Sequence, residues 1–405
     1  MKKLESSDKI TILALSWRDI KAPKAGGAEI HEHRLISGTD LNKFRIIHFS
    51  MAAKGLPEEE EIDGVTYLRA GGALGVIFAA AKFYRANKEN IDYVIDQCNT
   101  HRFFTRFWVP AEKRIFYIHQ LTREIWDYMA KPPISWGKYF ETAFLRLQKN
   151  DYCITVSDST KADLVAAGFN PDKVMVVPEW ITTKPWVWES LPTKTLPPYF
   201  VFVGRYATYK GIDVSIEALA EVKKTHPETK LVVVGKKNME YINSSLKPLC
   251  DKLGLTVNAG VDDNNSDVDV FLTGFVTDEE KLDYQSKATA LVFPSIREGW
   301  GLIITEAATV GTPSIVFNSP GSVDAVNKGK AGFLCSSNDV AGVASLMNYC
   351  LDNSSAYEAM RKSAYDFAVR YLEWGEGRDS LSEIIEVVRN GGKADEVSRL
   401  IGGQR

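Results

Sequence analysis

The sequence lacks the features that mark several large classes of protein. Its longest uncharged, largely apolar run, residues 70–81, is about half of the roughly 20 residues that a membrane-spanning helix needs. No Cys-x-x-Cys pair occurs, and no cysteine has a histidine at a zinc-site spacing. These absences exclude a membrane-spanning bundle. They also indicate that the widely spaced cysteines are small core residues in a reducing compartment: Cys98, Cys153, Cys250, Cys335 and Cys350.

An excess of basic charge is also missing. Lys and Arg number 49 against 52 Asp and Glu, and the formal net charge is −3. Wholesale binding of nucleic acid through a basic surface is therefore disfavoured. The first nine residues carry charge but are followed by one strand-length apolar run and no small-residue cleavage site. We therefore expect a cytoplasmic protein.

Short β-rich runs alternate with helical patterns along the whole chain of 405 residues, of which 45% are hydrophobic and 25% charged. This alternation predicts parallel sheets made of βαβ units and covered by helices on both faces. We expect strands over residues 10–16, 45–51, 65–69, 93–97, 114–119, 153–157, 174–178, 200–204, 231–235, 270–273, 291–294, 314–317 and 332–335.

The domain organisation follows from a stretch with four prolines, residues 182–198, which has little periodicity and indicates a linker. The tail has helical periodicity and no strands, so we expect it to pack outside the second sheet or to reach back to the N-terminal domain. The predicted parts are an N-terminal Rossmann-like domain, a linker, a C-terminal Rossmann-like domain and a helical tail, over residues 1–184, 185–198, 199–370 and 371–405.

The strongest motif is the run LVFPSIREGWGL, in which a strand leads to a loop and then to an apolar helix beginning near Leu302. A helix N-terminus presents unpaired N–H groups and partial positive charge, and Gly299 and Gly301 let an anion approach the backbone. Glu298 and Glu306 flank this end, where each can accept hydrogen bonds from sugar hydroxyls. The pattern indicates a diphosphate site, and the alternative is two exposed acids near a helix start.

A second motif, YFVFVGRYATYKG, places Arg205 and Lys210 in one loop between a buried strand and a helix. Ligands of α/β sheets usually bind at the carboxyl ends of strands. Two fixed cations there can neutralise a diphosphate and stabilise it as a leaving group. The alternative is a pair of solvated surface cations.

A third motif places Gly26 and Gly27 between the first strand and a helix. Such a loop can bring backbone N–H groups against a phosphate or a sugar, and a plain loop is the alternative. No Gly-x-Gly-x-x-Gly run, the dinucleotide-binding fingerprint, occurs, so the sequence gives little support for an enzyme that transfers hydride with a dinucleotide cofactor.

Together these positions resemble the retaining GT-B glycosyltransferases that carry the Glu-x7-Glu motif (glycosyl transferases group 1, family 4 type): Gly26, Gly27, His119, Arg205, Lys210, Glu298 and Glu306. The resemblance covers nearly the whole chain and is densest over residues 199–339. It implies an α/β protein of GT-B architecture, with two Rossmann-like, doubly wound parallel-sheet domains facing each other across a cleft. It also implies a retaining hexosyltransferase that moves a hexose-type sugar from a nucleoside-diphosphate sugar to a glycan, lipid-linked or small-molecule acceptor, without metal or other cofactor.

The same resemblance assigns roles by matching position. Glu306 would hold the ribose hydroxyls, Glu298 the hydroxyls of the transferred sugar, and His119 would lie beside the reacting carbon. The catalytic residues it implies are His119, Glu298, Arg205 and Lys210. The donor-binding residues it implies are Gly26, Gly27, Arg205, Lys210, Phe275, Val276, Glu298, Gly299, Trp300, Gly301, Leu302 and Glu306, with Phe275 and Val276 at the base.

Two segments depart from the family pattern. Residues 178–182 read Pro-Glu-Trp-Ile-Thr where the family tends to carry Pro-Asn-Gly-Ile-Asp, and the lost glycine removes an easy left-handed turn. Residues 320–324 read Pro-Gly-Ser-Val-Asp where many members have Gly-Gly-x-x-Glu. Two metal-like patterns are discounted: Asp267-x-Asp269 lies in a polar loop, and His31-x-His33 places its rings on different sides of a helix.

Residues 101–150 combine nine Lys and Arg, four Asp and Glu, and twelve aromatic residues. Basic residues interleaved with Trp and Tyr suit an anionic membrane surface or a polyprenyl-phosphate acceptor. Peripheral contact with the inner face of a membrane is therefore a hypothesis, and the alternatives are core packing and a sugar-stacking platform. We expect a nucleotide-sugar donor and a glycan or lipid-linked acceptor as partners, and no nucleic acid.

Three other functions stay open at this point. A nucleotide-sugar epimerase or a sugar phosphorylase can share this fold. A non-catalytic subunit can also keep a nucleotide-sugar site without turnover.

Overall fold

The computed structural model describes residues 3–23, 25–99, 102–128, 136–181, 183–260, 265–375 and 378–397. The chain divides into two compact units. The described part of the N-terminal unit is residues 3–23, 25–99, 102–123, 136–179, 374–375 and 378–397, and that of the C-terminal unit is residues 124–128, 180–181, 183–260 and 265–373. Each unit has its own sheet and its own core.

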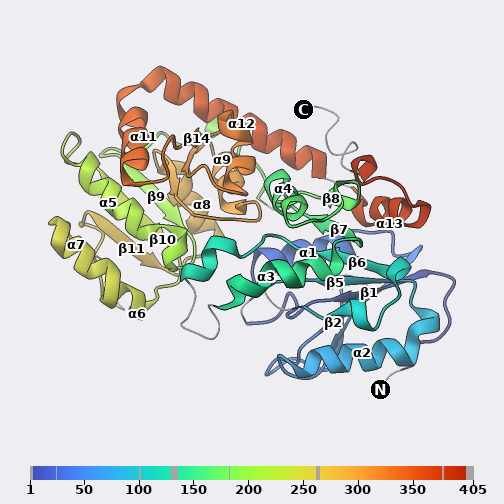
Figure 1. Ribbon diagram of the computed structural model, residues 1–405. Coiled ribbons are helices and arrows are strands. Elements are labelled where there is room, and N and C mark those ends of the chain that lie inside the picture. Colours follow the sequence, from blue (N-terminus) through green and yellow to red (C-terminus); the bar gives the residue numbers. More distant parts are fainter. Residues whose placement is uncertain are drawn as a thin grey trace. The chain divides into compact units, whose positions relative to one another are not determined.

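The N-terminal unit is built on an eight-stranded sheet of order β3-β4-β2-β1-β5-β6-β7-β8 (Figure 1). Adjacent strands are parallel except β3 and β4, which pair in antiparallel fashion. The strands are β1 Ile10–Leu15, β2 Phe44–Ser50, β3 Glu59–Ile62, β4 Val65–Arg69, β5 Tyr93–Gln97, β6 Arg114–Tyr117, β7 Tyr152–Thr155 and β8 Val174–Val176. Because the order reverses between β1 and β5, this sheet is doubly wound and has its topological switch point there.

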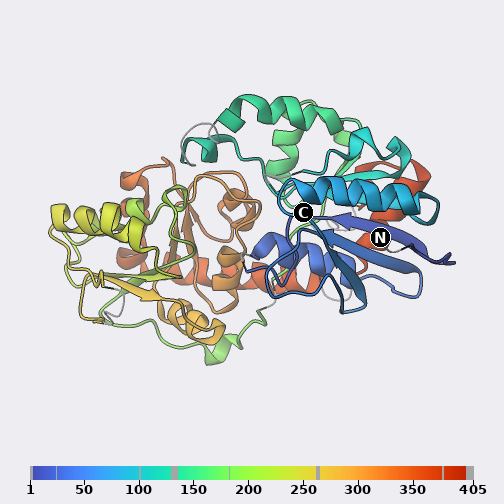
Figure 2. The ribbon, with the colours of Figure 1, turned by 90° about the horizontal axis from the view of Figure 1, so that it is seen from below.

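Helices cover this sheet on both faces, and α1 and α2 lie on opposite sides of it (Figure 1). Seen from below, α2 lies along the strands (Figure 2). Leu13 and Leu15 of β1 pack in one buried cluster with Phe83 of α2, because alternate strand residues point to the same face. The helices of this unit are α1 Gly27–Ser37, α2 Gly75–Asn87, α3 Gly137–Leu145, α4 Asp158–Ala166 and α13 Ser380–Asn390.

The C-terminal unit has a six-stranded sheet of order β11-β10-β9-β12-β13-β14, and every pair of neighbours is parallel. The strands are β9 Tyr199–Val203, β10 Lys230–Val234, β11 Val270–Gly274, β12 Leu291–Phe293, β13 Ser314–Val316 and β14 Phe333–Leu334. Almost every residue of β9 and β10 is buried, as expected of apolar runs covered on both faces. The order is that of a dinucleotide-binding fold, with its reversal between β9 and β12.

The helices of this unit lie on both faces of its sheet (Figure 1). Helix α8 shows why a segment becomes a helix: Thr277 accepts a hydrogen bond from the Glu280 N–H, and the Glu280 carboxylate accepts one from the Thr277 N–H. The helices are α5 Ile212–Val222, α6 Met239–Tyr241, α7 Lys247–Leu253, α8 Asp278–Lys287, α9 Leu302–Thr309, α10 Ser322–Ala325, α11 Val340–Asp352 and α12 Ser354–Gly375. Helix α12 leads to the boundary between the units at residues 373–374.

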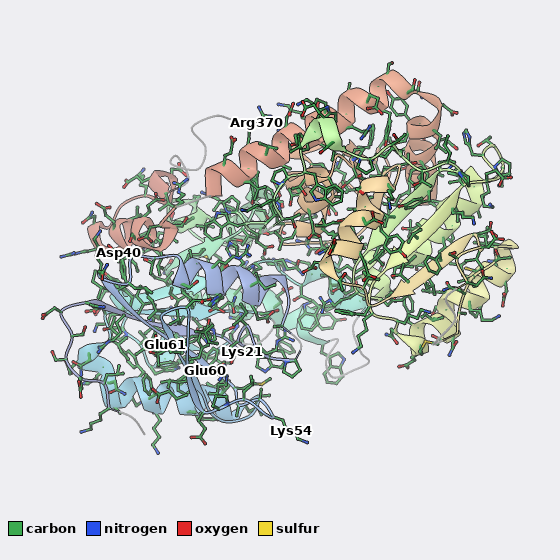
Figure 3. All side chains as sticks on the ribbon, turned by 180° about the vertical axis from the view of Figure 1, so that it is seen from behind. Lys21, Asp40, Lys54, Glu60, Glu61 and Arg370 are labelled. Atoms are coloured by element: carbon green, nitrogen blue, oxygen red, sulfur yellow. The ribbon has the colours of Figure 1, made fainter. Side chains whose placement is uncertain are left out.

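The predicted strands are all confirmed, with ends that differ by at most two residues. Strand β3 was not predicted, because its sequence, Glu-Glu-Glu-Ile, contains little apolar surface. Its Glu60 forms ion pairs with Lys21 and with Arg69 of β4, and Figure 3 shows Lys21 and Glu60 close together. Charged partners therefore hold this edge strand.

All five cysteines are buried and free, which confirms the prediction that they are core residues. The tail is helical where it is described, in α12 and α13, and residues 376–377 and 398–405 lie outside the described residues. Among the described residues, no helix combines the length and the apolar character that crossing a membrane requires.

Candidate functional site

The loops that follow β9 and β12 form the centre of the site in the C-terminal unit. These strands are adjacent, and they flank the point where the strand order reverses. The Ile296 N–H donates to the Tyr209 carbonyl at 3.1 Å, which joins the two loops directly. The sequence motifs around residues 205–210 and 298–306 are therefore brought to one end of the sheet, where α/β folds bind ligands.

Lys210 and Glu298 form an ion pair across these two loops. The Lys210 ammonium lies 2.5 Å from the Glu298 carboxylate, and both side chains are about one-eighth exposed, at 12% each. The ammonium also lies 5.2 Å from the ring centre of Tyr209 and 5.4 Å from that of Phe293. The carboxylate and the two rings fix the position of this cation at the sheet end.

Arg205 is the second cation of the first loop. Its side chain is exposed, and its guanidinium donates to the Tyr209 hydroxyl at 3.2 Å. Tyr209 therefore contacts both cations, Lys210 through its ring and Arg205 through its hydroxyl. Sequence reasoning missed this tyrosine, although it lies directly before Lys210 in the motif.

The second loop ends at the N-terminus of α9. Gly301 has a φ of 90° and immediately precedes Leu302, the first residue of the helix. A left-handed residue here suits glycine, and the first N–H groups of a helix have no carbonyl partner one turn earlier within it. Gly299 and Trp300 are buried, and the Trp300 ring stacks on Tyr371 of α12 with ring centres 4.9 Å apart. The loop is thus anchored by its tryptophan beside a helix end that can take an anion.

Glu306 lies on the second turn of α9. Its carboxylate is 2.7 Å from the Lys281 ammonium of α8 and accepts a hydrogen bond from the Thr183 hydroxyl at 3.0 Å. Burial alone would lower the pKa of Lys281, but Glu306 and Asp278 outweigh it and raise that pKa above its ordinary value. Each acid of the Glu-x7-Glu pair therefore has a lysine partner of its own.

A third loop, after β13, supports Glu298. The Glu298 N–H donates to the Pro320 carbonyl at 3.0 Å. Gly321 has a φ of 78°, and a Cβ atom built on it would lie 2.3 Å from the Glu298 carbonyl oxygen. Only glycine fits there without a shift of the loop. This is the segment where the sequence departs from the family pattern, and its glycine is what brings it against Glu298.

Phe275 and Val276 follow β11 and lead into α8, the helix that carries Lys281. Phe275 is 84% exposed, which is unusual for a large apolar side chain. Helix α8 links these two residues to α9, because its Lys281 pairs with Glu306. The predicted base-contacting pair and the predicted ribose-binding acid are therefore connected through one helix.

The remaining predicted residues belong to the N-terminal unit. His119 follows β6 and is 7% exposed, and its Nδ1 lies 2.7 Å from the carboxylate of Glu179, the residue after Pro178. Its Nε2 lies 3.2 Å from the side-chain amide nitrogen of Gln97, at the end of β5. Gln97 in turn accepts a hydrogen bond from the Ser16 hydroxyl, which follows β1. We call Ser16, Gln97, His119 and Glu179 the carboxyl-edge chain.

Gly26 caps helix α1, and Gly27, which was predicted to lie in the loop before the helix, is its first residue. The Gly26 N–H donates to the Glu29 carboxylate at 2.8 Å, and that carboxylate also pairs with Arg18 at 3.1 Å and accepts from Asn99 at 3.2 Å. A carboxylate of the same helix therefore occupies this N–H group.

The histidines of α1 have separate partners. His31 contacts the Tyr117 hydroxyl and lies 3.2 Å from the Pro178 carbonyl, while His33 lies 2.7 Å from the Tyr67 hydroxyl and 2.9 Å from Asp63. Burial lowers the pKa of His31 to about 4. The two rings contact different groups, as their spacing on a helix predicts.

The two acids of the Asp267-x-Asp269 pattern have lysine partners. Asp267 pairs with Lys230 at 3.1 Å, and Asp269 pairs with Lys223 at 2.7 Å. Residues 261–264 of the same polar loop lie outside the described residues. Among those that are described, no group of three or more His, Cys, Asp and Glu side chains is arranged to hold a metal ion.

Sequence reasoning missed several residues that complete the site. Lys281 gave no signal, because its partner Glu306 is 25 positions away and on another helix. Arg297 is 4% exposed and pairs with Glu124 at 2.7 Å, and its place beside Glu298 in the motif was a usable signal. The pair Pro320-Gly321 before α10 was a second usable signal, since a Pro-Gly pair marks a turn, here the one after β13.

Family models match both halves of the chain. Residues 189–367 match the model of glycosyl transferases group 1, and residues 25–184 match that of glycosyltransferase family 4. The two matches together include every strand of both sheets except β1, and they include the motifs around residues 205–210 and 298–306. The chain belongs to the group 1 glycosyltransferases.

Individual relatives of this group 1 glycosyltransferase agree with that assignment. The chain is 28% identical to a glycogen synthase of Mycobacterium tuberculosis over 232 residues, which are 56% of this chain and 52% of the relative. It is 29% identical to a D-inositol 3-phosphate glycosyltransferase of Acidothermus cellulolyticus over 236 residues, or 53% of this chain and 50% of the relative. The chain thus spans about half the length of the curated relatives that it matches.

Solved structures share the GT-B fold. A sucrose-phosphate synthase from Thermosynechococcus elongatus superposes with a TM-score of 0.71 at 16% identity, over 95% of this chain and 100% of that one. HepE from Anabaena, in complex with UDP and glucose, superposes with a TM-score of 0.64 at 15% identity, over 93% of this chain and 99% of that one. The predicted fold class, two doubly wound Rossmann-like domains of GT-B type, is therefore confirmed.

Proposed function

We propose that this chain transfers a hexose-type sugar from a nucleoside-diphosphate sugar to a glycan, lipid-linked or small-molecule acceptor. The observation that carries the proposal is the Lys210–Glu298 pair, held at 2.5 Å between the two loops at the switch point of the C-terminal sheet. A cation and a carboxylate in contact there suit a ligand that is an anion on one side and a polyol on the other. UDP and glucose in the HepE complex are consistent with that class of donor.

The positive groups suit a departing nucleoside diphosphate. Arg205 and Lys210 supply two fixed charges, and the N–H groups at the start of α9, around Gly301 and Leu302, supply a helix end. In the proposed reaction the bond between the anomeric carbon and the phosphate oxygen breaks, and a bond from the acceptor oxygen forms on the same face of the sugar. The acceptor proton leaves with the phosphate oxygen. This step retains configuration and uses no metal or cofactor.

The acids and the histidine have separate proposed roles. Glu298 accepts hydrogen bonds from hydroxyls of the transferred sugar, and Glu306 accepts them from the ribose. Phe275 and Val276 contact the base, and Gly299 and Trp300 complete the loop around the phosphates. The N-terminal unit contributes His119 beside the reacting carbon, and Gly26 with Gly27 on the donor side.

The proposal is tested by replacing one residue on each side of the site. We expect Lys210→Ala and Glu306→Ala each to lower the transfer rate by about 100- to 1,000-fold, because each removes a group that acts on the bound donor. Lys224→Ala is the matched control, since Lys224 is exposed, follows α5 and pairs with Glu221 of that helix. A thermal-shift screen over nucleoside diphosphates and their sugars first identifies the donor. Unchanged turnover in both site variants would contradict the proposal.

We also propose that the segment 101–150 makes peripheral contact with an anionic membrane surface. Residues 101 and 129–135 of this segment lie outside the described residues. In the rest, Phe103, Phe116 and Tyr117 belong to the core, which accounts for part of the aromatic content. Six aromatic residues of the segment are exposed, and three of them lie on α3: Tyr139, Phe140 and Phe144, in addition to Phe107, Tyr128 and Trp136 elsewhere in the segment.

The exposed aromatic side chains of α3 support this contact. Tyr139 is 70% exposed and Phe140 is 54% exposed, and the ammonium of Lys138 lies 5.4 Å from the ring centre of Tyr139. Exposed rings beside lysines bind at the headgroup region of anionic bilayers. We expect the protein to co-sediment with anionic vesicles and not with neutral ones at low salt, and the Tyr139→Ser, Phe140→Ser double variant to stay in solution. Equal binding by the double variant would remove α3 from the contact.

A further inference from the structure

The carboxyl-edge chain crosses most of the width of the N-terminal sheet. Ser16 follows β1, Gln97 ends β5, His119 comes two residues after β6, and Glu179 comes three residues after β8. Strands β1 and β5 flank the switch point of this sheet. Four side chains far apart in sequence thus form one hydrogen-bonded row along the edge where doubly wound sheets bind ligands.

The hydrogen bonds in this row have one consistent set of directions when the Glu179 carboxylate is ionised and the His119 ring is neutral. An ionised carboxylate only accepts, so the Nδ1 of His119 donates to Glu179 across their 2.7 Å contact. The Nε2 of the neutral ring is then an acceptor, and it faces the Gln97 amide nitrogen, a donor, at 3.2 Å. The remaining Gln97 oxygen accepts from the Ser16 hydroxyl. One carboxylate therefore sets the direction of the whole row.

Burial makes the carboxylate and the imidazole depend on each other. Glu179 is 6% exposed and His119 is 7% exposed, and a buried carboxylate needs a hydrogen-bonding partner. His31, whose ring centre is 5.5 Å from that of His119, contacts the Tyr117 hydroxyl and the Pro178 carbonyl instead. Burial keeps His31 neutral by lowering its pKa to about 4, so it does not neutralise Glu179 near pH 7.

We propose that Glu179 is a positioning residue that holds His119 in the form protonated at Nδ1. The Nε2 lone pair is thereby kept available at the carboxyl edge, where a sugar hydroxyl of the donor takes the place of the Gln97 amide as its hydrogen-bond donor. This inference rests on the proposed transfer reaction and deepens it. It also gives a reason for the departure at residues 178–182, of which Thr182 lies outside the described residues. An asparagine amide can donate or accept, whereas a carboxylate at 179 only accepts.

The protonation state of His119 can be measured without any substrate. In protein labelled with nitrogen-15 at histidine, we expect the His119 signals at pH 7.5 to show a protonated Nδ1 and an unprotonated Nε2. The signals are assigned by their loss in His119→Gln. We expect Glu179→Ala to shift the ring toward protonation at Nε2, and Glu179→Gln to keep protonation at Nδ1, because its amide oxygen still accepts there.

Kinetics then test whether this state matters for transfer. We expect Glu179→Ala to lower kcat/KM by about 10- to 100-fold, as loss of one hydrogen bond to a charged group does, and Glu179→Gln to lose less. Nucleoside-diphosphate binding, measured by thermal shift, is expected to stay unchanged in both variants. A purely structural role would weaken all of these properties together.

Glu32→Gln is the matched control. Glu32 is a buried acid in the same unit, and its carboxylate lies 3.4 Å from Nε2 of His48. This pair lies outside the carboxyl-edge chain. We expect Glu32→Gln to lower stability as much as the Glu179 variants do and to leave the transfer rate unchanged.

The outcomes separate the two proposals. A His119 ring protonated at Nε2 in the wild type overturns the inference directly, even if Glu179→Ala does not fold. Unchanged His119 signals in a folded Glu179→Ala overturn it as well, as does an unchanged kcat/KM. A wild-type protein that transfers no sugar from any nucleotide sugar refutes the proposed function, whereas the histidine signals still report on Glu179.

Discussion

Replacing Gly321 by alanine tests whether the loop after β13 sets the position of Glu298. Gly321 has φ and ψ of 78° and −52°, which an L-residue adopts only with strain. The added Cβ would also lie 2.3 Å from the Glu298 carbonyl oxygen, so the loop after β12 must shift. Gly254 is the matched control: its φ is 70°, and nothing lies within 4 Å of a Cβ built on it.

The two variants separate backbone strain from displacement of the site. Left-handed strain costs roughly 1–2 kcal/mol, and forcing an atom into packed surroundings adds about 1–3 kcal/mol. For a unit of about 200 residues each kcal/mol lowers Tm by about 2–4 °C. We therefore expect Gly254→Ala to lower Tm by about 2–8 °C and Gly321→Ala by about 4–20 °C.

The transfer assay gives the sharper contrast. A shift of about 1 Å in a group that positions substrate costs about 100-fold in rate. We expect that loss in Gly321→Ala and full activity in Gly254→Ala, measured at a temperature where both are folded. If the two variants have the same Tm and the same rate, the contact of Gly321 with Glu298 does not position the acid and the reasoning is wrong.

Two further predictions follow from charges in the structure. The pKa of His31 is about 4 in the folded protein and 6.5 in the unfolded chain, so the unfolded state binds more protons between these values and stability is lost as pH falls through them. Between pH 7.5 and pH 4.5, we expect the free energy of unfolding, measured with urea, to fall by about 2 kcal/mol more in the wild type than in His31→Gln. Lys281→Met removes the partner of Glu306, and we expect the dissociation constant of the nucleoside diphosphate to rise by about 3- to 10-fold. Lys287→Met on the same helix, where Lys287 pairs with Asp283, should leave it unchanged.

The strands and the location of the site could be predicted from sequence for a physical reason. Runs such as Tyr199–Val203 and Lys230–Val234 are apolar because both faces are covered, and their periodicity differs from that of the helices between them. Parallel strands end at one edge, so motifs after β9 and β12 had to meet there. The contact between Lys210 and Glu298, which are 88 positions apart, follows from that topology.

The pairs that complete the site could not be predicted in this way. Lys281 reaches Glu306 from a neighbouring helix, and Glu179 reaches His119 across 60 positions of chain. Neither contact lies within one βαβ unit, so no local spacing in the sequence predicts either of them. The change at residue 179 was visible as a departure from the family pattern, but its partner was not. Side-chain contacts between loops depend on rotamers and burial, which a sequence pattern does not contain.

The lysine partners of Glu298 and Glu306 have a consequence for ligand discrimination. Each acid neutralises a lysine, so Lys210 and Lys281 offer less attraction to a free inorganic anion than two unpaired lysines would. A phosphate ion alone would have to displace a carboxylate from Lys210 and would leave that carboxylate uncompensated. A nucleotide sugar brings hydroxyl donors for the displaced acids together with its own negative charge. For the proposed donor, the exchange at these two pairs is balanced because the molecule carries both kinds of group, so the two ion pairs favour such a molecule over a simple anion.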